Sequence, residues 1–518
     1  MNTPQTIHNI VLNLSIPQRP RSSVSIMCNS PPRDIMGQRN SPAILFTLLM
    51  LSATLSGCFG NDEVEQVVEV TTPLDGLFTT TSWYHYAGAV NASNDTIGYD
   101  NLTGNSTPYP AVGTYYGMGD TTFEPTIGVT STGGIHFASY GGTGSGSMIF
   151  TSMDQGQTWN NMGPFNPIIP SIGQVPSSND PYIYVDKWTD RIVKFDMHAL
   201  TAMFVEYSDD DGQSWSIPFT AEGYYTPQDH QSIASMPDID GRGFYETIFV
   251  FCINTGSSAA GPQCSRSLDG GHTWDVQRPG YPTDTAQCSG LHGHLAGSND
   301  GAIYRGNPSC EGPAVYRSLD GGYSWTEHTI TTSVPMQEGW HSHEVAVAAD
   351  EAGNLFASWI SIDDMPWMAY SRDQGDTWSE PMMVAPPGVN ETGFPTIFAG
   401  DEGRVVVGYI GEGDDLGGWG GYMSVMTDAF ADNPLITTVA VNLPSDPLDI
   451  TDDCGNVRCG GFGDFIDVEI DDEGRPWIAL AHNTNGELGI VGTYVTGPAL
   501  FGELRQLPEI SAGGPSTL

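Results

Sequence analysis

The sequence predicts an all-β fold in which one supersecondary unit is repeated as a toroid or an array. Five copies of a short motif begin 56, 59, 51 and 53 residues apart, at Ser152, Ser208, Ser267, Ser318 and Ser371. A repeat of this period is typical of such architectures. No stretch shows a sustained helical period, and 63 Gly and 36 Pro fit many short strands joined by turns.

The motif has the form Ser-x-Asp-x-Gly-x-x-Trp, and its chemistry is that of a tight turn. The carboxylate can accept backbone N–H groups of its own turn. The glycine supplies a backbone conformation that a side chain would resist, and the tryptophan offers a large apolar face. We therefore expect a structural role, rather than calcium binding or acid catalysis, for the five motif aspartates, which are Asp154, Asp210, Asp269, Asp320 and Asp373.

This pattern resembles the Asp box of the sialidase-like β-propellers. The resemblance implies blades of antiparallel strands arranged radially, with Asp-box hairpins at one face of the ring. It does not imply an activity, because one fold hosts many functions.

Polar turns followed by apolar runs give the number of units. Seven such turns precede runs such as Leu355–Trp359, Val405–Tyr409 and Trp477–Leu480, and the last two units lack the motif. We predict a seven-bladed propeller over residues 121–500, with six blades as the alternative, because sialidases have six. Residues 72–120 are expected to cap or close the ring, and residues 501–518 to form a tail.

The N-terminal region predicts export and a lipid anchor. Arg39 precedes the apolar run 43–51, which has the length of a signal-peptide core and is too short to span a bilayer. Leu55-Ser-Gly-Cys58 resembles the lipobox of prokaryotic lipoproteins, which implies lipidation of Cys58. We expect a presequence and signal peptide over 1–57, an acidic tether over 58–71, and an extracytoplasmic protein on the cell surface. An ordinary cleaved signal is the alternative.

The charge excludes one class of partner. The chain carries 17 Lys and Arg against 61 Asp and Glu, a formal net charge of −44. Such a field repels nucleic acid and other anionic surfaces, so we expect no nucleic-acid partner. The partners that remain are the membrane, through the anchor, and a glycan or a surface protein.

Six cysteines follow Cys58 and fall into close pairs. An even count with local spacing predicts three disulfides in an oxidising compartment. The expected pairs are Cys252 with Cys264, Cys288 with Cys310, and Cys454 with Cys459.

Histidines gather where the innermost strands of three consecutive blades are expected to begin, which is the ligand face in related propellers. They are His230, His292, His294, His341 and His343. In a His-x-His pair on a strand both rings point to one side. With Glu344 or Asp464, these imidazoles suit zinc, copper or iron. A structural or pH-sensitive role and direct ligand contact are the alternatives.

Sialidase activity fits the sequence poorly. Those enzymes need three arginines that clamp the substrate carboxylate, for which a bidentate guanidinium is well suited. Only Arg278, Arg305 and Arg458 are expected to reach the ligand face. Other glycoside hydrolysis needs only two suitably placed carboxylates, for which Glu344 and Asp464 are the first candidates.

The favoured function is therefore a binding module for a glycan, a peptide or a metal ion. No cofactor is certain, and a transition metal or calcium is the class to test. The alternative is a sialidase-like glycoside hydrolase that acts on extracellular glycans, so whether the chain is an enzyme stays open.

Overall fold

The computed structural model describes residues 82–86, 111–122, 124–140, 147–163, 180–198, 200, 202–221, 228–255, 261–283, 291, 293–337, 344–413, 418–448, 463–482 and 488–502. All regular elements within these ranges are strands, and none of these residues belongs to a helix that could cross a membrane. The predicted presequence and tether lie outside the described residues, as do residues 503–518 of the tail.

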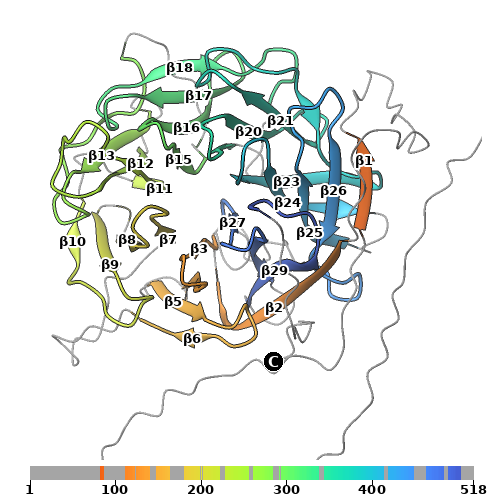
Figure 1. Cartoon of the computed structure of the whole chain (residues 1–518), viewed down its shortest axis with the longest axis horizontal. Helices are drawn as coiled ribbons and strands as arrows, with labels where there is room; N and C mark the ends of the chain where they lie inside the picture. Colours follow the sequence, from red (N-terminus) through yellow and green to blue (C-terminus); the bar gives the residue numbers. More distant parts are fainter. Residues whose placement is uncertain are drawn as a thin grey trace, which may run out of the picture. The chain divides into compact units, whose positions relative to one another are not determined.

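The described strands form seven antiparallel sheets around a central axis, and this arrangement is a seven-bladed β-propeller (Figure 1). The predicted fold class is confirmed, and the six-bladed alternative is wrong. Each blade takes its strands in chain order from the axis outward, because short turns join neighbouring antiparallel strands.

Blades 1 to 3 carry the first three motifs. Blade 1 consists of β3 (Ile127–Val129), β4 (Ile135–Tyr140), β5 (Ser147–Ser152) and β6 (Asn160–Asn161). Blade 2 consists of β7 (Pro181–Val185), β8 (Ile192–His198), β9 (Ala202–Ser208) and β10 (Phe219–Thr220). Blade 3 consists of β11 (Gln228–Pro237), β12 (Thr247–Thr255), β13 (Gln263–Ser267) and β14 (Arg278–Pro279).

Blades 4 and 5 carry the last two motifs. Blade 4 consists of β15 (Leu295–Gly297), β16 (Ile303–Pro308), β17 (Pro313–Ser318) and β18 (Thr326–Thr329). Blade 5 consists of β19 (Val345–Ala349), β20 (Leu355–Ile360), β21 (Pro366–Ser371) and β22 (Met382–Met383).

Blades 6 and 7 each recruit a strand from the N-terminal part of the chain. Blade 6 consists of β23 (Val389–Ala399), β24 (Val405–Gly413), β25 (Gly418–Met426), β26 (Leu435–Ala440) and the added β1 (Ser82–Tyr86). Blade 7 consists of β27 (Asp467–Ile470), β28 (Pro476–His482), β29 (Leu488–Thr496) and the added β2 (Val112–Thr121). Since β2 pairs with β29, the two distant parts of the chain close the ring.

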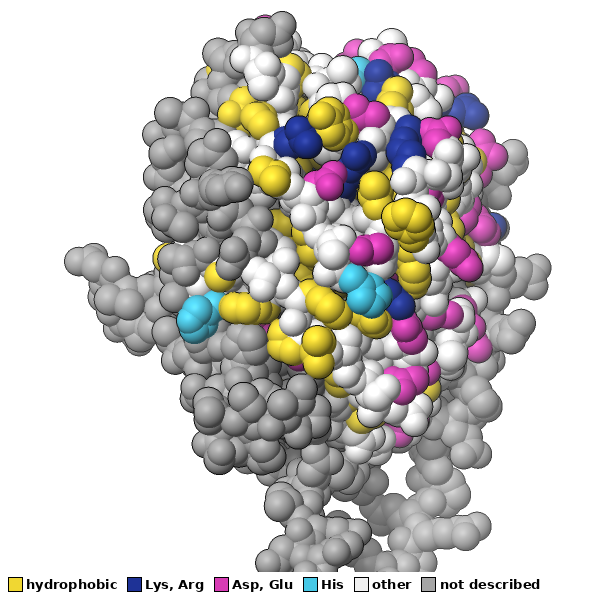
Figure 2. Space-filling model, turned by 90° about the vertical axis from the view of Figure 1, so that its left-hand side faces the viewer, with side chains coloured by type: hydrophobic (Ala, Val, Ile, Leu, Met, Phe, Trp, Pro, Cys, Tyr) yellow, Lys and Arg dark blue, Asp and Glu magenta, His cyan; other side chains and the backbone are white. Residues whose placement is uncertain are grey.

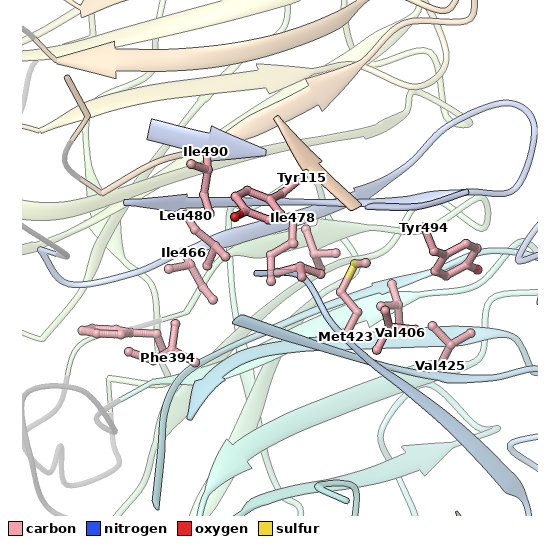
Figure 3. Close-up of a cluster of buried hydrophobic side chains, with 14 of the residues drawn as sticks. Tyr115, Phe394, Val406, Met423, Val425, Ile466, Ile478, Leu480, Ile490 and Tyr494 are labelled. Carbon is pink, nitrogen blue, oxygen red and sulfur yellow. The ribbon is translucent and has the colours of Figure 1, made fainter. Parts of the chain in front are cut away.

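The hydrophobic core lies between the blades. The contact between blades 6 and 7 contains Tyr115 of β2, Val406 of β24 and Ile478 of β28, each at most 1% exposed (Figure 3). The second strand β20 is buried at all six positions and is apolar except for Ser358, as expected for a strand that packs on both faces.

Candidate functional site

The direction of the strands determines at which end of the ring each turn and its side chains lie. The seven inner strands all start at one end, here called the upper end, and the turns that follow them lie at the other, the lower end. Third strands run parallel to inner strands, so the motifs that follow them also lie at the lower end.

The carboxylates of the five motif aspartates accept hydrogen bonds within their own turns. In the first motif, Ser152 Oγ and Thr158 N donate to Asp154 Oδ1 at 2.9 and 2.8 Å, and Thr158 Oγ1 donates to Oδ2 at 2.7 Å. The same bonds recur around Asp210, Asp269, Asp320 and Asp373. Hydrogen bonding from Thr377 holds the pKa of Asp373 below its ordinary value.

At the upper end, three side chains from three blades meet near the axis. His230 Nε2 lies 2.6 Å from Glu344 Oε1, and His230 Nδ1 lies 4.0 Å from Asp464 Oδ2. The three residues are 1%, 4% and 4% exposed. The structure thus brings both predicted carboxylates together with one predicted histidine, and we call these residues the His230 cluster.

The backbone around this cluster is held in unfavourable conformations. His230 has φ = 58° at a β-bulge in β11, and Glu124, just before β3, has φ = 50°. Glu124 Oε1 accepts the backbone N–H of Asp464 at 3.0 Å, and a Cβ at Gly463 would lie 2.1 Å from Glu124 Cγ. Non-glycine residues in such regions cost about 1–3 kcal/mol each and persist where the surroundings impose them, often at functional sites.

Phe465 forms the floor of the His230 cluster. Its ring is 1% exposed and lies edge-on to His230 and His294, at centroid distances of 5.3 and 5.1 Å. Tyr182 packs edge-on against Phe465 at 6.0 Å. The aromatic floor therefore separates His230 from the axial space below it.

His294 lies below that floor and pairs with a different carboxylate. Its Nδ1 is 3.2 Å from Asp467 Oδ1, while no hydrogen-bond partner of its Nε2 is found among the described residues. Burial opposes protonation of His294, but Asp467 and Glu344 outweigh that effect and raise its pKa. A histidine held at Nδ1 by a carboxylate presents Nε2 in the way that metal-binding histidines do.

Several predicted residues lie outside the described part of the chain. They are His292, His341, His343, Cys58, Cys288, Cys454 and Cys459. Within the described part, no group of three or more His, Cys, Asp or Glu side chains is placed to hold a metal ion. Cys252 and Cys264 form a disulfide between β12 and β13, and Cys310 is also disulfide-bonded.

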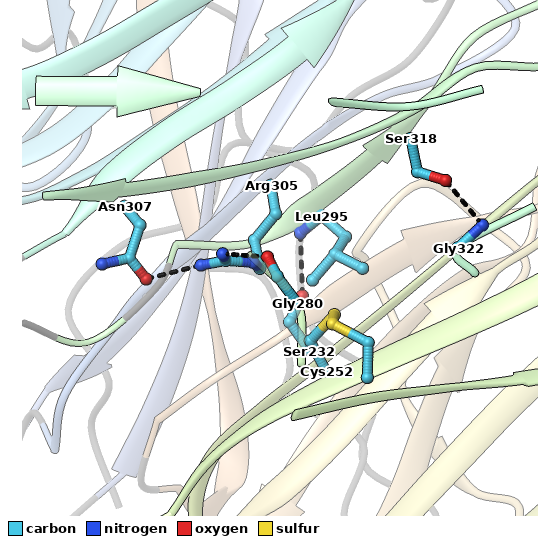
Figure 4. Close-up of a disulfide and its surroundings, with 9 residues drawn as sticks. Ser232, Cys252, Gly280, Leu295, Arg305, Asn307, Ser318 and Gly322 are labelled. Atoms are coloured by element: carbon cyan, nitrogen blue, oxygen red, sulfur yellow. Dashed lines mark hydrogen bonds between the residues drawn. A yellow bond between two sulfur atoms is a disulfide. The ribbon is translucent and has the colours of Figure 1, made fainter. Parts of the chain in front are cut away.

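The expectation that Arg278 and Arg305 reach the upper end is wrong. Arg305 is fully buried between blades 3 and 4, where it donates to Gly280 O at 2.6 Å (Figure 4). Its guanidinium also lies over the ring of Tyr316. Arg278 lies over Tyr323 of the fourth motif. Both rings attract the guanidinium through their π faces.

The other described arginines are paired with carboxylates. They lie within 4.0 Å of an Asp or Glu oxygen and are Arg191, Arg242, Arg266, Arg317, Arg372, Arg404 and Arg475. Figure 2 shows basic side chains lying among acidic ones on the flank of the ring that carries β10 and β13. Within the described ranges no arginine is available at the upper end to clamp a carboxylate substrate.

Sequence reasoning missed Glu124 and the role of Phe465 as a floor. Glu124 contacts a residue 340 positions away, and no local pattern marks such a contact. Sequence reasoning also missed the buried ion pair on β8, in which Asp196 Oδ2 lies 2.6 Å from Lys194 Nζ. A lysine two residues from an aspartate on a strand was the available signal, because i and i+2 share a face.

Comparison with known proteins does not assign this chain to a family. No family model and no curated protein matches the chain. Similar solved structures include a protein of unknown function from Dyadobacter fermentans, at 13% identity and a TM-score of 0.39, covering 77% of this chain and 99% of that one.

Two further structures resemble the chain to a similar degree. YCF48 bound to D1 peptide is 15% identical with a TM-score of 0.42, covering 75% of this chain and 96% of that one. A Hadza microbial sialidase is 17% identical with a TM-score of 0.39, covering 64% of this chain and 66% of that one. At these values the likeness carries no argument about function.

Proposed function

We propose that the protein is an Asp-box propeller anchored by lipid outside the cytoplasm, and that it binds a ligand at its upper end. Glycan, peptide and metal ion are the ligand classes. The observation that carries the proposal is the His230 cluster, in which His230, Glu344 and Asp464 come from three blades. A fold that needed only stability would gain more from apolar residues there, because buried charges are costly.

Of these ligand classes, a metal ion suits the donor groups best. His294 Nε2 is buried and has no hydrogen-bond partner among the described residues, while Asp467 fixes its Nδ1. This arrangement is the usual support of a metal-bound imidazole. The predicted partners His292, His341 and His343 flank His294 and Glu344 in sequence. Imidazole and carboxylate together favour zinc, copper or iron.

Elemental analysis of the detergent-solubilised full chain, purified without a metal-affinity tag, tests this proposal. We expect stoichiometric zinc, copper or iron in the wild type. A variant with alanine at His292, His294, His341 and His343 should lose it, and His294→Ala alone should lower the content at least tenfold.

A matched control carries alanine at His272 and His328, which lie in and beside the lower-end motifs. It should keep the metal. Folded wild-type protein without bound metal, or equal content in all variants, would refute the metal proposal and leave glycan or peptide as the ligand.

Glycoside hydrolysis is the second candidate, because Glu344 and Asp464 are two carboxylates near one another at the axis. Both are already near His230, and the described residues offer no arginine there. We therefore expect no turnover of aryl glycosides, sialosides included. Turnover abolished by Glu344→Gln or Asp464→Asn and kept by Glu412→Gln would establish the hydrolase instead.

A further inference from the structure

A cavity runs along the axis below the aromatic floor. It measures about 90 Å³ and is lined by residues from all seven inner strands. This volume has room for roughly six water molecules at the usual 10–15 Å³ each. Most of its wall is apolar, and backbone and side chains of Ile233, Val347 and Ile397 contribute to it.

Two side chains from the turn after β7 cross the lower end of this cavity. Trp188 Nε1 donates to Asn299 Oδ1 of blade 4 at 2.9 Å, and Lys187 Nζ donates to Glu351 Oε1 of blade 5 at 3.0 Å. The ring of Trp188 lies so near Gly297 that a Cβ there would be 3.3 Å from Cη2. The cavity therefore has a lower wall made of an indole and an ion pair.

One side of the cavity is polar. Asp467 and Glu469 are two residues apart on β27, so both point to the axis, and His294 adjoins them from β15. Asp467 is paired with His294. Among the described residues, no cationic side chain lies within ion-pair distance of Glu469. The carboxyl group of Glu469 accepts the backbone N–H of Ile470 and is the second carboxyl group on the cavity wall.

We propose that this axial cavity is a second binding site, separate from the His230 cluster, and that it takes a small protonated amine such as methylammonium. The N–H groups of such a cation would donate to Glu469 and Asp467. Its methyl group would rest on the apolar wall beside Trp188 and Tyr182, whose π faces attract cations.

Between Asp467 and Glu469, away from Nε2 of His294, a metal ion fits less well than an amine does. The described residues hold no group of three or more metal-binding side chains. A small dehydrated metal ion needs several oxygen or nitrogen ligands at once. An amine needs fewer acceptors and gains from the apolar wall, which the cavity supplies.

Proton release should accompany binding. Burial, and next the neighbouring Asp467, raise the pKa of Glu469 well above its ordinary value, while the Ile470 amide and Lys187 oppose this. The other titratable groups that line the cavity are Tyr182, Tyr184, Lys187 and His294. A raised pKa means that Glu469 gives up its proton less readily, so a cation that takes the place of this proton binds more tightly as the pH rises.

Calorimetry with methylammonium chloride on the detergent-solubilised full chain, at pH 6 and pH 8, tests the proposal. We expect saturable binding that is tighter at pH 8 than at pH 6. Glu469→Gln should weaken it at least tenfold and remove the pH dependence. This variant replaces the carboxyl group by an amide of nearly the same shape, so it should fold like the wild type.

Glu412→Gln, an exposed glutamate on β24, is the matched control and should bind like the wild type. Absence of binding, binding unchanged by Glu469→Gln, or equal displacement by sodium and potassium would overturn the proposal. Metal content is measured on the same variants. Because Glu469→Gln should leave it unchanged, this site and the proposed function of the upper end can fail independently.

Discussion

The two ends of the ring use charged side chains in opposite ways. At the lower end, carboxylates such as Asp373 are satisfied inside one short turn or by an adjacent arginine. At the upper end, His230, Glu344 and Asp464 are buried and come from blades 3, 5 and 7. The difference teaches that the motif aspartates at the lower end stabilise turns within single blades, whereas the His230 cluster at the upper end depends on the closed ring.

The largest effect is expected at Gly463. A Cβ there would meet Glu124 at 2.1 Å, and the positive φ of 66° disfavours any side chain. We expect Gly463→Ala to lower the free energy of unfolding by about 3 kcal/mol, combining backbone strain and overpacking. Urea denaturation measures this loss.

Gly133 at the lower end is the control for Gly463. It also has a positive φ, of 84°, but a Cβ would meet nothing within 4 Å. Gly133→Ala should cost about 1–2 kcal/mol, from backbone strain alone. Equal losses at the two glycines would show that the contact with Glu124 contributes nothing.

A smaller effect is expected when one lower-end turn loses its carboxylate. Asp373→Ala removes the acceptor of hydrogen bonds from Ser371 and Thr377, each worth about 1 kcal/mol or less when exposed. We expect a loss of about 1–2 kcal/mol in thermal or urea unfolding. Metal and amine binding should not change, and a change in either would contradict the division between the two ends.

The smallest effect concerns a contact between blades 1 and 2 at the lower end. The imidazole of His136, whose Nε2 lies 3.7 Å from Asp211 Oδ1, and hydrogen bonds from Thr130 and Thr132 lower the pKa of Asp211 to about 2. A depressed carboxyl pKa adds stability above the unfolded value near 3.9 that is lost as the pH falls toward 2.

Asp211→Asn should therefore cost about 1 kcal/mol at pH 6, after allowance for solvent screening, and almost nothing near pH 2. Unfolding free energies of the two proteins between pH 2 and pH 6 measure this. A loss that is independent of pH would mean that shape, and not charge, holds the contact.

The same contrast explains what the sequence could predict. The seven polar turns and the five motifs are local patterns, so the number of blades and the lower-end turns could be read from residue spacing. The inner-strand starts also placed His230, Glu344 and Asp464 at one end. Neither the burial of Arg305 nor the support of Asp464 by Glu124 could be foreseen, because both depend on packing between distant segments.

The pairing of β2 with β29 also determines when the ring can close during synthesis of the chain. Residues 112–121 are synthesised long before their hydrogen-bonding partner 488–496. Until then β2 has an unpaired edge, and such edges are where chains associate wrongly. Closing so long a loop is also slow. The propeller can therefore become complete only after residues 488–496 have been synthesised, and a chain shortened before β29 would leave its seventh blade without an outer pair.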